Sequence, residues 1–191
     1  MRIGVIGPGR IGGNTARQAL KAGHEVALGF SRDTARLEAL AEELGPEASA
    51  ATPAQVVESS ASSIASQGTA MPAAGQTAAQ FNAARMPGAR YTKSFNTLTS
   101  AFQVEAAERT GDERVVQWIC GDDPDAKRVV SDLIAAMGYQ PVDLGATADC
   151  EVMEAPRRPG SVYGEEYRLP DALGVVEAVK AGEAIPPTPR Y

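Results

Sequence analysis

Short apolar runs alternate with amphipathic segments at the start of the chain. Residues 2–6 (RIGVI) and residues 25–30 (EVALGF) are mostly apolar runs of the length expected for buried strands. Apolar residues recur at helical spacing between these runs, over residues 11–22, and again over residues 34–44. A strand, a helix and a second strand within about thirty residues predict a βαβ unit with parallel strands and a right-handed crossover.

The second half of the chain contains further elements of the same two kinds. We expect strands at residues 90–95, 114–120 (RVVQWIC) and 140–144, and helices at residues 124–137 and 170–180. Asp123 and Pro124 are the residue types that begin a helix, and Gly138 is the type that ends one. Trp118 and Cys120 are expected in the core because they lie on the most apolar of these strands.

The middle of the chain departs from this pattern. Ile64 is the single large apolar residue in residues 58–70 (ESSASSIASQGTA), whereas the central strands of a doubly wound sheet are nearly continuous apolar runs. The sequence predicts an α/β, Rossmann-type doubly wound fold with a mostly parallel sheet whose middle strands are shortened or missing. Residues 58–70 are then a surface loop, and residues 90–95 could take the place beside the first strand.

Length sets the expected domain organisation. A chain of 191 residues has the size of one ordinary domain. We expect an NADP-binding domain over residues 1–150 and a small C-terminal extension over residues 151–191 that packs on it.

Charge and composition exclude several classes of partner. The chain carries 18 basic and 24 acidic residues, a net charge of −6, which argues against a nucleic-acid partner. No apolar stretch approaches the length of a membrane span, so no membrane partner is expected. Cys120 and Cys150 lie thirty positions apart without a C-x-x-C pair, which suggests neither a disulfide framework nor a zinc site. No metal is expected, and the absence of a leader pattern before the first strand favours the cytoplasm.

A glycine-rich turn follows the first predicted strand and opens the first predicted helix. Residues 7–13 (GPGRIGG) match the G-x-G-x-x-G pattern in the context that dinucleotide binding requires. In that pattern the first glycine permits a tight turn, the second lets the backbone approach a pyrophosphate, and the third lets helix and strand pack closely. The helix start supplies backbone N–H groups and a positive dipole end for the anion. The predicted cofactor-binding residues of the turn are Gly7, Pro8, Gly9, Arg10, Ile11 and Gly12.

The end of the second strand indicates which dinucleotide is bound. NAD enzymes place an acidic residue there for the ribose hydroxyls, whereas this chain has Ser31 and Arg32. A hydroxyl and a guanidinium suit a 2′-phosphate, so we predict NADP(H) as the cofactor. Asp33 either reaches the ribose or caps the helix that begins at residue 34. Arg10 is either a second phosphate contact or a solvated charge.

Three motifs together resemble a known family. The glycine turn, the segment GFSRD at residues 29–33 and the segment KSFNT at residues 93–97 are similar to motifs of the coenzyme F420-dependent NADP oxidoreductase family, with Ser94 where the family has alanine. That family also includes the reductase domain of the membrane ferric reductases. The resemblance covers residues 1–50 and about 71–145. It implies a Rossmann-type NADP-binding domain, a homodimer, and hydride transfer between NADPH and a deazaflavin (F420) or a flavin.

Hydride transfer between two rings needs stacking and exclusion of water more than acid–base help. We predict Lys93, Asn96 and Thr97 as catalytic residues. Asn96 and Thr97 would hydrogen-bond the carboxamide or the acceptor ring, and Lys93 would handle charge. The alternative is a polar strand end that caps the next helix.

Two other groups of residues are candidates for a role. Arg157, Arg158 and Tyr163 form a basic cluster near an aromatic ring, which either grips an anionic acceptor or is a solvated loop. His24, the single histidine, is expected to be a structural turn residue.

The function expected from these observations is an NADP(H)-dependent oxidoreductase acting on a small molecule, with a deazaflavin or flavin-like hydride acceptor. The alternatives are a non-catalytic NADP-binding module and an NADPH-dependent reductase of a small imine or carbonyl. The last of these would require a proton donor, and the sequence offers no clear candidate.

Overall fold

The computed structural model describes residues 1–29, 33–59, 62–65 and 72–191. The chain divides into two compact units, Met1–Thr69 and Ala70–Tyr191, which we call the first and second units. No helix in the described ranges is both long enough and apolar enough to cross a membrane.

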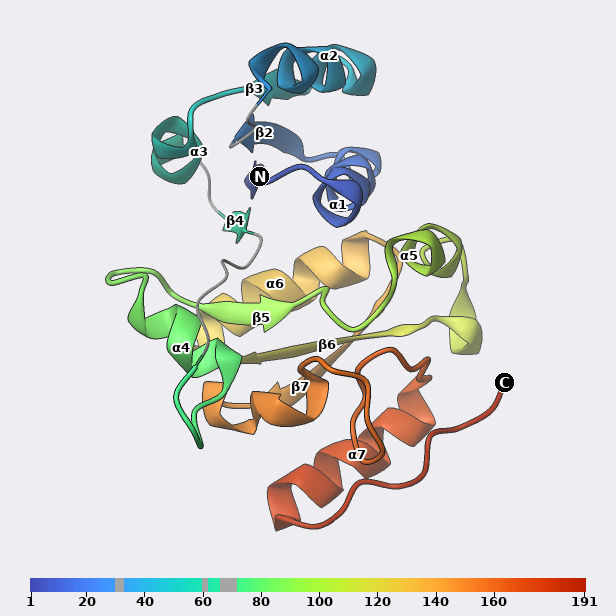
Figure 1. Ribbon diagram of the computed structural model, residues 1–191. Coiled ribbons are helices and arrows are strands. Elements are labelled where there is room, and N and C mark those ends of the chain that lie inside the picture. Colours follow the sequence, from blue (N-terminus) through green and yellow to red (C-terminus); the bar gives the residue numbers. More distant parts are fainter. Residues whose placement is uncertain (30–32, 60–61, 66–71) are drawn as a thin grey trace. The chain divides into compact units, whose positions relative to one another are not determined.

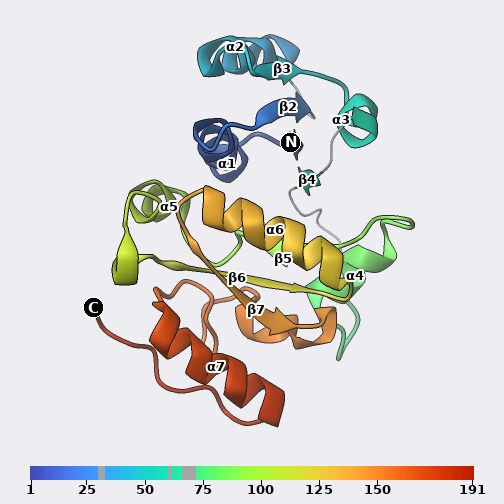
Figure 2. The same ribbon diagram turned by 180° about the vertical axis from the view of Figure 1, so that it is seen from behind.

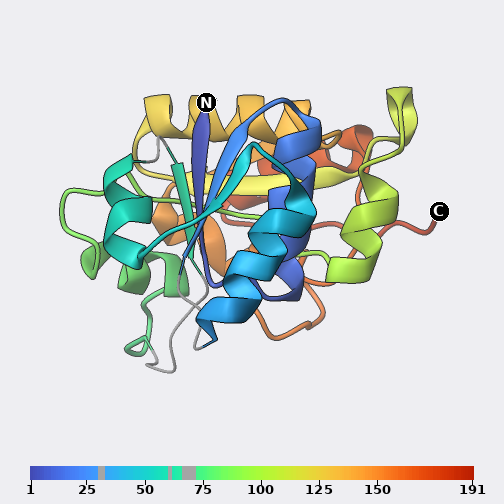
Figure 3. The same ribbon diagram turned by 90° about the horizontal axis from the view of Figure 1, so that it is seen from above.

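The first unit is a parallel sheet with helices on both faces. Its elements, in chain order, are β1 (Arg2–Ile6), α1 (Arg10–Lys21), β2 (Glu25–Gly29), α2 (Thr34–Leu44), β3 (Ala48–Ala50), α3 (Pro53–Ser59) and β4 (Ser62–Ala65). The strand order is β3-β2-β1-β4, and α1 and α2 cover one face while α3 covers the other (Figures 1 and 3). The chain moves outward from β1 to β3 and then returns to the other side of β1. The strand order therefore reverses between β1 and β4, which is where open α/β sheets bind ligands.

The structure corrects one expectation and confirms another in this sheet. Residues 62–65 form β4 and pair with Ile3–Ile6 of β1, so the segment at 90–95 does not take the place beside the first strand. The middle strands are short, as predicted: β3 has three residues and β4 has four. Of the predicted loop 58–70, residues 60–61 and 66–70 lie outside the described residues.

The second unit contains a separate, mixed sheet. Its elements are α4 (Ala78–Ala84), β5 (Thr92–Ser94), α5 (Ser100–Ala106), the 3-10 helix η1 (Gly111–Glu113), β6 (Val116–Gly121), α6 (Pro124–Ala136), β7 (Gln140–Gly145), the 3-10 helix η2 (Thr147–Met153) and α7 (Leu169–Ala181). The order is β5-β6-β7, with β7 parallel to β6 and β5 antiparallel to it. Figure 2 shows α6 on one face of this sheet and α7 on the other.

The core of the second unit forms on the face that α7 and η2 cover. Trp118 of β6 packs edge-on against Tyr167, with ring centroids 5.3 Å apart, and both side chains are buried. Val116 and Cys120 point to the same face, because side chains alternate along a strand. The predicted core positions of Trp118 and Cys120 are therefore confirmed.

A disulfide joins Cys120 of β6 to Cys150 of η2, with the two Cα atoms 6.2 Å apart. The spacing of the two cysteines had suggested no disulfide, and this expectation was wrong. The two cysteines are thirty positions apart, and the fold brings the strand and the 3-10 helix together in the core. Spacing alone could not reveal that contact.

The compact units divide the chain at a different place from the expected boundary after residue 150. That boundary falls inside η2, whose Cys150 and Met153 are fully buried with the second sheet. Within the last 41 residues, α7 packs on the second sheet and supplies Ala172 and Val175 to its core.

Candidate functional site

The glycine turn lies at the carboxyl end of β1 and leads directly into α1. Gly7 has a φ of +82°, a value that glycine adopts without steric cost. Its N–H donates to the carbonyl of Gly29 at the end of β2 (2.9 Å), and Gly9 N–H donates back to the carbonyl of Gly7 (2.8 Å). The turn is thus fixed to two neighbouring strands at the edge where the strand order reverses.

The glycines of the turn differ in the space that an added Cβ would find. A Cβ added at Gly12 would lie 2.7 Å from the carbonyl oxygen of Gly7 and 3.2 Å from Val5 Cγ1, so only glycine lets α1 approach β1 this closely. A Cβ added at Gly9 would meet nothing within 4 Å. The open space above Gly9 is where a bound phosphate could approach the backbone.

The start of α1 presents backbone N–H groups to this space. Gly9 is the N-cap, makes no side-chain cap bond, and accepts the first intrahelical bond from Gly13 N–H (2.8 Å). The amides of Arg10, Ile11 and Gly12 precede that bond, and the first turn has no acidic residue. Arg10 is exposed, and the side chain of Ile11 is 46% exposed. This helix start can hold an anion through backbone amides and the positive end of the helix dipole.

The residues predicted to select the 2′-phosphate, Ser31 and Arg32, lie outside the described residues. Asp33, which follows them, is the N-cap of α2, and its carboxylate accepts from Arg36 N–H (3.1 Å). The structure therefore supports the capping interpretation of Asp33 over the ribose contact.

Lys93 of β5 is buried, with 6% of its surface exposed. Its Nζ lies 3.0 Å from Oε1 of Glu154, which is also buried, so its charge is already paired within the chain. This ion pair gives Lys93 a structural contact within the second unit.

Asn96 and Thr97 follow the end of β5. The Asn96 Nδ2 group donates to the carbonyl of Met153 (2.7 Å). Asn96 Oδ1 and Thr97 Oγ1 are buried and have no hydrogen-bond partner among the described residues. Neither residue caps the next helix, because Thr99 is the N-cap of α5. Both oxygens are thus enclosed by protein and lack a partner in the described part of the chain.

The direction of β5 determines the edge of the second sheet at which Asn96 and Thr97 lie. Because β5 is antiparallel to β6, Asn96 and Thr97 are at the sheet edge opposite the carboxyl ends of β6 and β7. They therefore lie at the edge where β6 and β7 begin.

The basic cluster near Tyr163 is engaged within the chain. Arg157 makes two hydrogen bonds to the Glu165 carboxylate (2.6 and 3.0 Å). Arg158 donates to three backbone carbonyls, those of Glu151, Glu154 and Pro156. These bonds leave little donor capacity for an anionic acceptor.

His24 has the structural position that the sequence predicts. Its Nδ1 lies 3.3 Å from the amino group of Met1. Partial burial, and then the charge of that amino group, lower the pKa of its imidazole. In the described part of the chain, no group of three or more His, Cys, Asp or Glu side chains could hold a metal ion.

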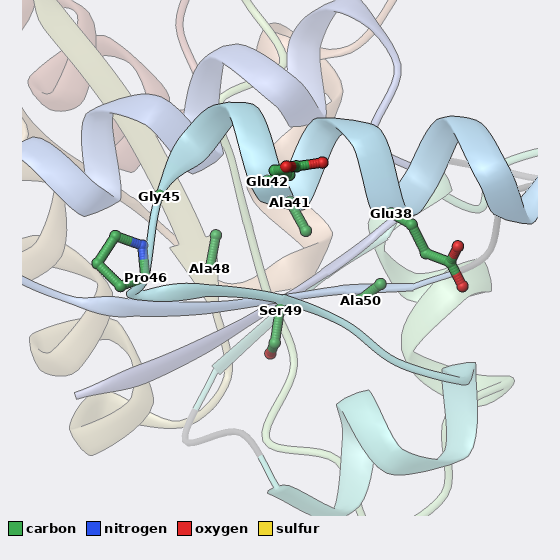
Figure 4. A pocket seen from close by; sticks show the side chains of 8 residues that line it. All are labelled: Glu38, Ala41, Glu42, Gly45, Pro46, Ala48, Ser49 and Ala50. Carbon is green, nitrogen blue, oxygen red and sulfur yellow. The ribbon is translucent and has the colours of Figure 1, made fainter.

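A cavity of about 500 Å³ lies between α2 and the edge strand β3, and no sequence signal pointed to it. Figure 4 shows Glu38 and Glu42 on its helical side and Ser49 on its strand side. Its lining does not include the glycine turn. It is open and bears carboxylates, so it does not suit a phosphorylated ligand.

The comparisons with known proteins match the part of the chain that contains the glycine turn. Residues 2–82 match the family described as NADP oxidoreductase, coenzyme F420-dependent. The metalloreductase STEAP3 of Rattus norvegicus is 38% identical over 80 residues, which are 42% of this chain and 16% of that protein. The predicted family resemblance is confirmed over residues 2–82, and the KSFNT segment lies beyond the matched range.

Solved structures share the fold. A hypothetical protein from Sinorhizobium meliloti has a TM-score of 0.68 and 24% identity, with 88% of this chain and 96% of that chain covered. A putative F420-dependent NADP-reductase from an Arthrobacter species has a TM-score of 0.62 and 21% identity, with 78% and 86% covered. The predicted α/β, Rossmann-type class is confirmed by this likeness and by the parallel sheet of the first unit.

Proposed function

Because residues 2–82 match the coenzyme F420-dependent NADP oxidoreductase family, we propose that the chain binds NADP(H) and transfers hydride between it and a deazaflavin or flavin-like acceptor. One observation carries the proposal: the turn at residues 7–13 lies at the carboxyl end of β1, beside the reversal of strand order, with the amides at the start of α1 unoccupied by a side-chain cap. That arrangement suits a pyrophosphate.

Each part of the turn has a role in holding the dinucleotide. Gly7 shapes the turn, Gly9 leaves room for the pyrophosphate, and Gly12 lets α1 lie close behind it. Ser31 and Arg32 are proposed to bind the 2′-phosphate, since a guanidinium offers a planar pair of donors to phosphate oxygens. The role of Arg10, an exposed residue at the first helical position, is proposed as a further phosphate contact.

Asn96 and Thr97 are proposed to hydrogen-bond a carboxamide or the acceptor ring. Their two unpartnered oxygens suit the N–H groups of a carboxamide or of a flavin-like ring. When bound, NADPH would donate the hydride or NADP⁺ would accept it, and the residues of the chain would bind and orient the rings and exclude water. Lys93 stays a predicted catalytic residue, and its charge is paired with that of Glu154 in this structure.

The cofactor part of the proposal is tested by titrating NADPH and NADH into the wild-type protein and Arg32→Ala. We expect a selective loss of NADPH affinity of about 1.5 to 3 kcal/mol, the scale of a hydrogen bond to a charged group. Arg2→Ala is the control, because Arg2 is an exposed arginine at the opposite end of β1. Equal weakening of both cofactors by Arg32→Ala would contradict the assignment.

The acceptor part is tested by following NADPH oxidation with F420, with free flavins and with ferric chelates. Turnover with F420 or a flavin supports hydride transfer. Tight NADPH binding without turnover on any acceptor would reduce the chain to a binding module and overturn the enzymatic part.

A further inference from the structure

We infer that Glu154 is a positioning residue: its buried carboxylate fixes the backbone carbonyl of Met153, and that carbonyl orients the amide of Asn96 toward the ligand. The inference rests on the proposed function for the identity of the ligand. It rests on contacts within the second unit for everything else.

The carboxylate of Glu154 is held by three donors from two other elements. Its Oε1 accepts from Lys93 Nζ (3.0 Å) and from Ala79 N–H (2.8 Å), and its Oε2 accepts from Ala78 N–H (2.8 Å). Ala78 and Ala79 begin α4, so Glu154 links the start of that helix to β5. Glu154 and Lys93 are 9% and 6% exposed, respectively.

This network strongly opposes movement of Glu154. A buried charge without its partner destabilises the fold, because it has lost its hydration and no ion pair or hydrogen bond replaces it. Displacing Glu154 would leave Lys93 and two backbone amides without an acceptor at once. The side chain of Glu154 therefore keeps the backbone at residues 153–154 in place.

The other end of η2 is held as well. Thr147 donates to the carboxylate of Asp122 through both its N–H (2.9 Å) and its Oγ1 (2.7 Å). The Thr147 carbonyl accepts from Thr77 Oγ1 (2.8 Å). With both ends anchored, η2 presents the Met153 carbonyl at a fixed point.

That carbonyl decides which way the Asn96 amide faces. A carbonyl oxygen can only accept, so the group 2.7 Å from Met153 O must be the Nδ2 donor of Asn96. Oδ1 then points away from η2 and has no partner among the described residues. Asn96 consequently holds a buried acceptor, which would match a ligand group that carries an N–H, as a carboxamide or a flavin-like pyrimidine ring does.

The direct test compares Glu154→Gln with Glu165→Gln. The control removes the same charge from another ion pair of the second unit, that between Arg157 and Glu165. Hydrogen exchange of the Asn96 side-chain amide is followed by NMR, with the resonance assigned from Asn96→Ala. We expect exchange about tenfold faster or more in Glu154→Gln, since one factor of ten is about 1.4 kcal/mol, and no change in the control.

A kinetic arm separates positioning from general damage. We expect Glu154→Gln to lower kcat about 10- to 100-fold with F420 or flavin while the NADPH dissociation constant stays within about twofold. If Glu154 acts through Asn96, this loss disappears in the Asn96→Ala background. Losses that multiply in the double variant would overturn the inference.

A second variant guards against misfolding. Lys93→Met combined with Glu154→Gln removes both buried charges, so no unpaired charge remains to unfold the chain. We expect this variant to fold and still to lose protection of the Asn96 amide. Wild-type protection in both variants would overturn the inference. A wild-type chain without turnover would defeat the proposed function, while the exchange measurement would still decide the role of Glu154.

Discussion

Individual atoms in the turn after β1 decide what it can hold. Sequence reasoning assigned different roles to Gly7, Gly9 and Gly12, and the structure separates two of these roles by geometry. Gly12 is required by the protein itself, because a Cβ there would lie 2.7 Å from the Gly7 carbonyl oxygen. Gly9 has no such constraint within the protein, so the close approach of a pyrophosphate is the proposed reason for glycine at this position.

Alanine at each of these two positions should therefore fail in a different way. We expect Gly12→Ala to lower the free energy of unfolding by about 1 to 3 kcal/mol, the cost of overpacking. We expect Gly9→Ala to keep that free energy within about 1 kcal/mol of wild type while weakening NADPH binding about tenfold or more. Urea unfolding and NADPH titration measure the two effects. Unchanged NADPH affinity in Gly9→Ala would count against a pyrophosphate at this turn.

The Lys93–Glu154 pair shows what residue-level reading of a sequence cannot supply. The motif KSFNT predicted a catalytic role for Lys93. Glu154, the residue that pairs with Lys93, lies 61 positions away. No local spacing connects the two, so the structural contact of Lys93 emerged only from the fold.

At the scale of elements, caps and turn residues made helices predictable. The predicted helix at residues 34–44 matches α2, because Asp33 caps its start and Gly45, with a φ of +97°, ends it. The helices α4 and α5 were missed, since each has seven residues and too few turns to show a periodic apolar pattern. β4 was missed because pairing with β1, a long-range interaction, forms it despite its serines.

The capping role of Asp33 makes a testable difference to stability and none to cofactor choice. Asp33→Ala should lower the free energy of unfolding by about 1 kcal/mol through loss of the bond from Arg36 N–H. Asp33→Asn, which keeps a capping oxygen, should be nearly neutral. The ratio of NADPH to NADH affinity should be unchanged in both variants. A marked shift of that ratio toward either cofactor would restore the ribose interpretation.

The cap of α6 predicts how stability responds to acid. Hydrogen bonds from the Arg90 guanidinium, and then from Ala126 N–H, hold the pKa of the Asp123 carboxyl well below its ordinary value of 3.8. A carboxyl whose pKa is lower in the folded state stabilises the fold above the unfolded value and loses that contribution as the pH falls below it. Asp123→Asn and Arg90→Ala should each flatten the fall of unfolding free energy below about pH 4, measured by urea unfolding across pH. A wild-type slope in Arg90→Ala would show that the ion pair does not set this pKa.

At the scale of the molecule, the sequence indicated the fold class but not the division of the chain into two units. The alternation of strands and helices identified a Rossmann-type α/β chain, because that pattern is local. Strand pairing decides both the separation into units at residues 69 and 70 and the direction of β5. No single segment of the sequence specifies which strands pair. The place at which α7 packs could not be predicted for the same reason, since the sheet face that α7 covers is formed by distant strands.

The disulfide between Cys120 and Cys150 should contribute measurably to the stability of the second unit. Its closed loop spans thirty positions, which corresponds to about 3.5 kcal/mol in the chain-entropy model. Urea unfolding with and without a thiol reductant should differ by about this amount, and reduction should reveal two titratable thiols in denaturant. Equal stability under both conditions, or two free thiols without reductant, would contradict the bond.

The same bond closes residues 120–150 into a covalent ring that contains α6 and β7. A single cut in the backbone between those two elements, for example at the Gly138 connection, opens the ring without releasing either end. The strands β6 and β7 would stay tethered after such a nick, and the two pieces would migrate together on a gel until a thiol was added.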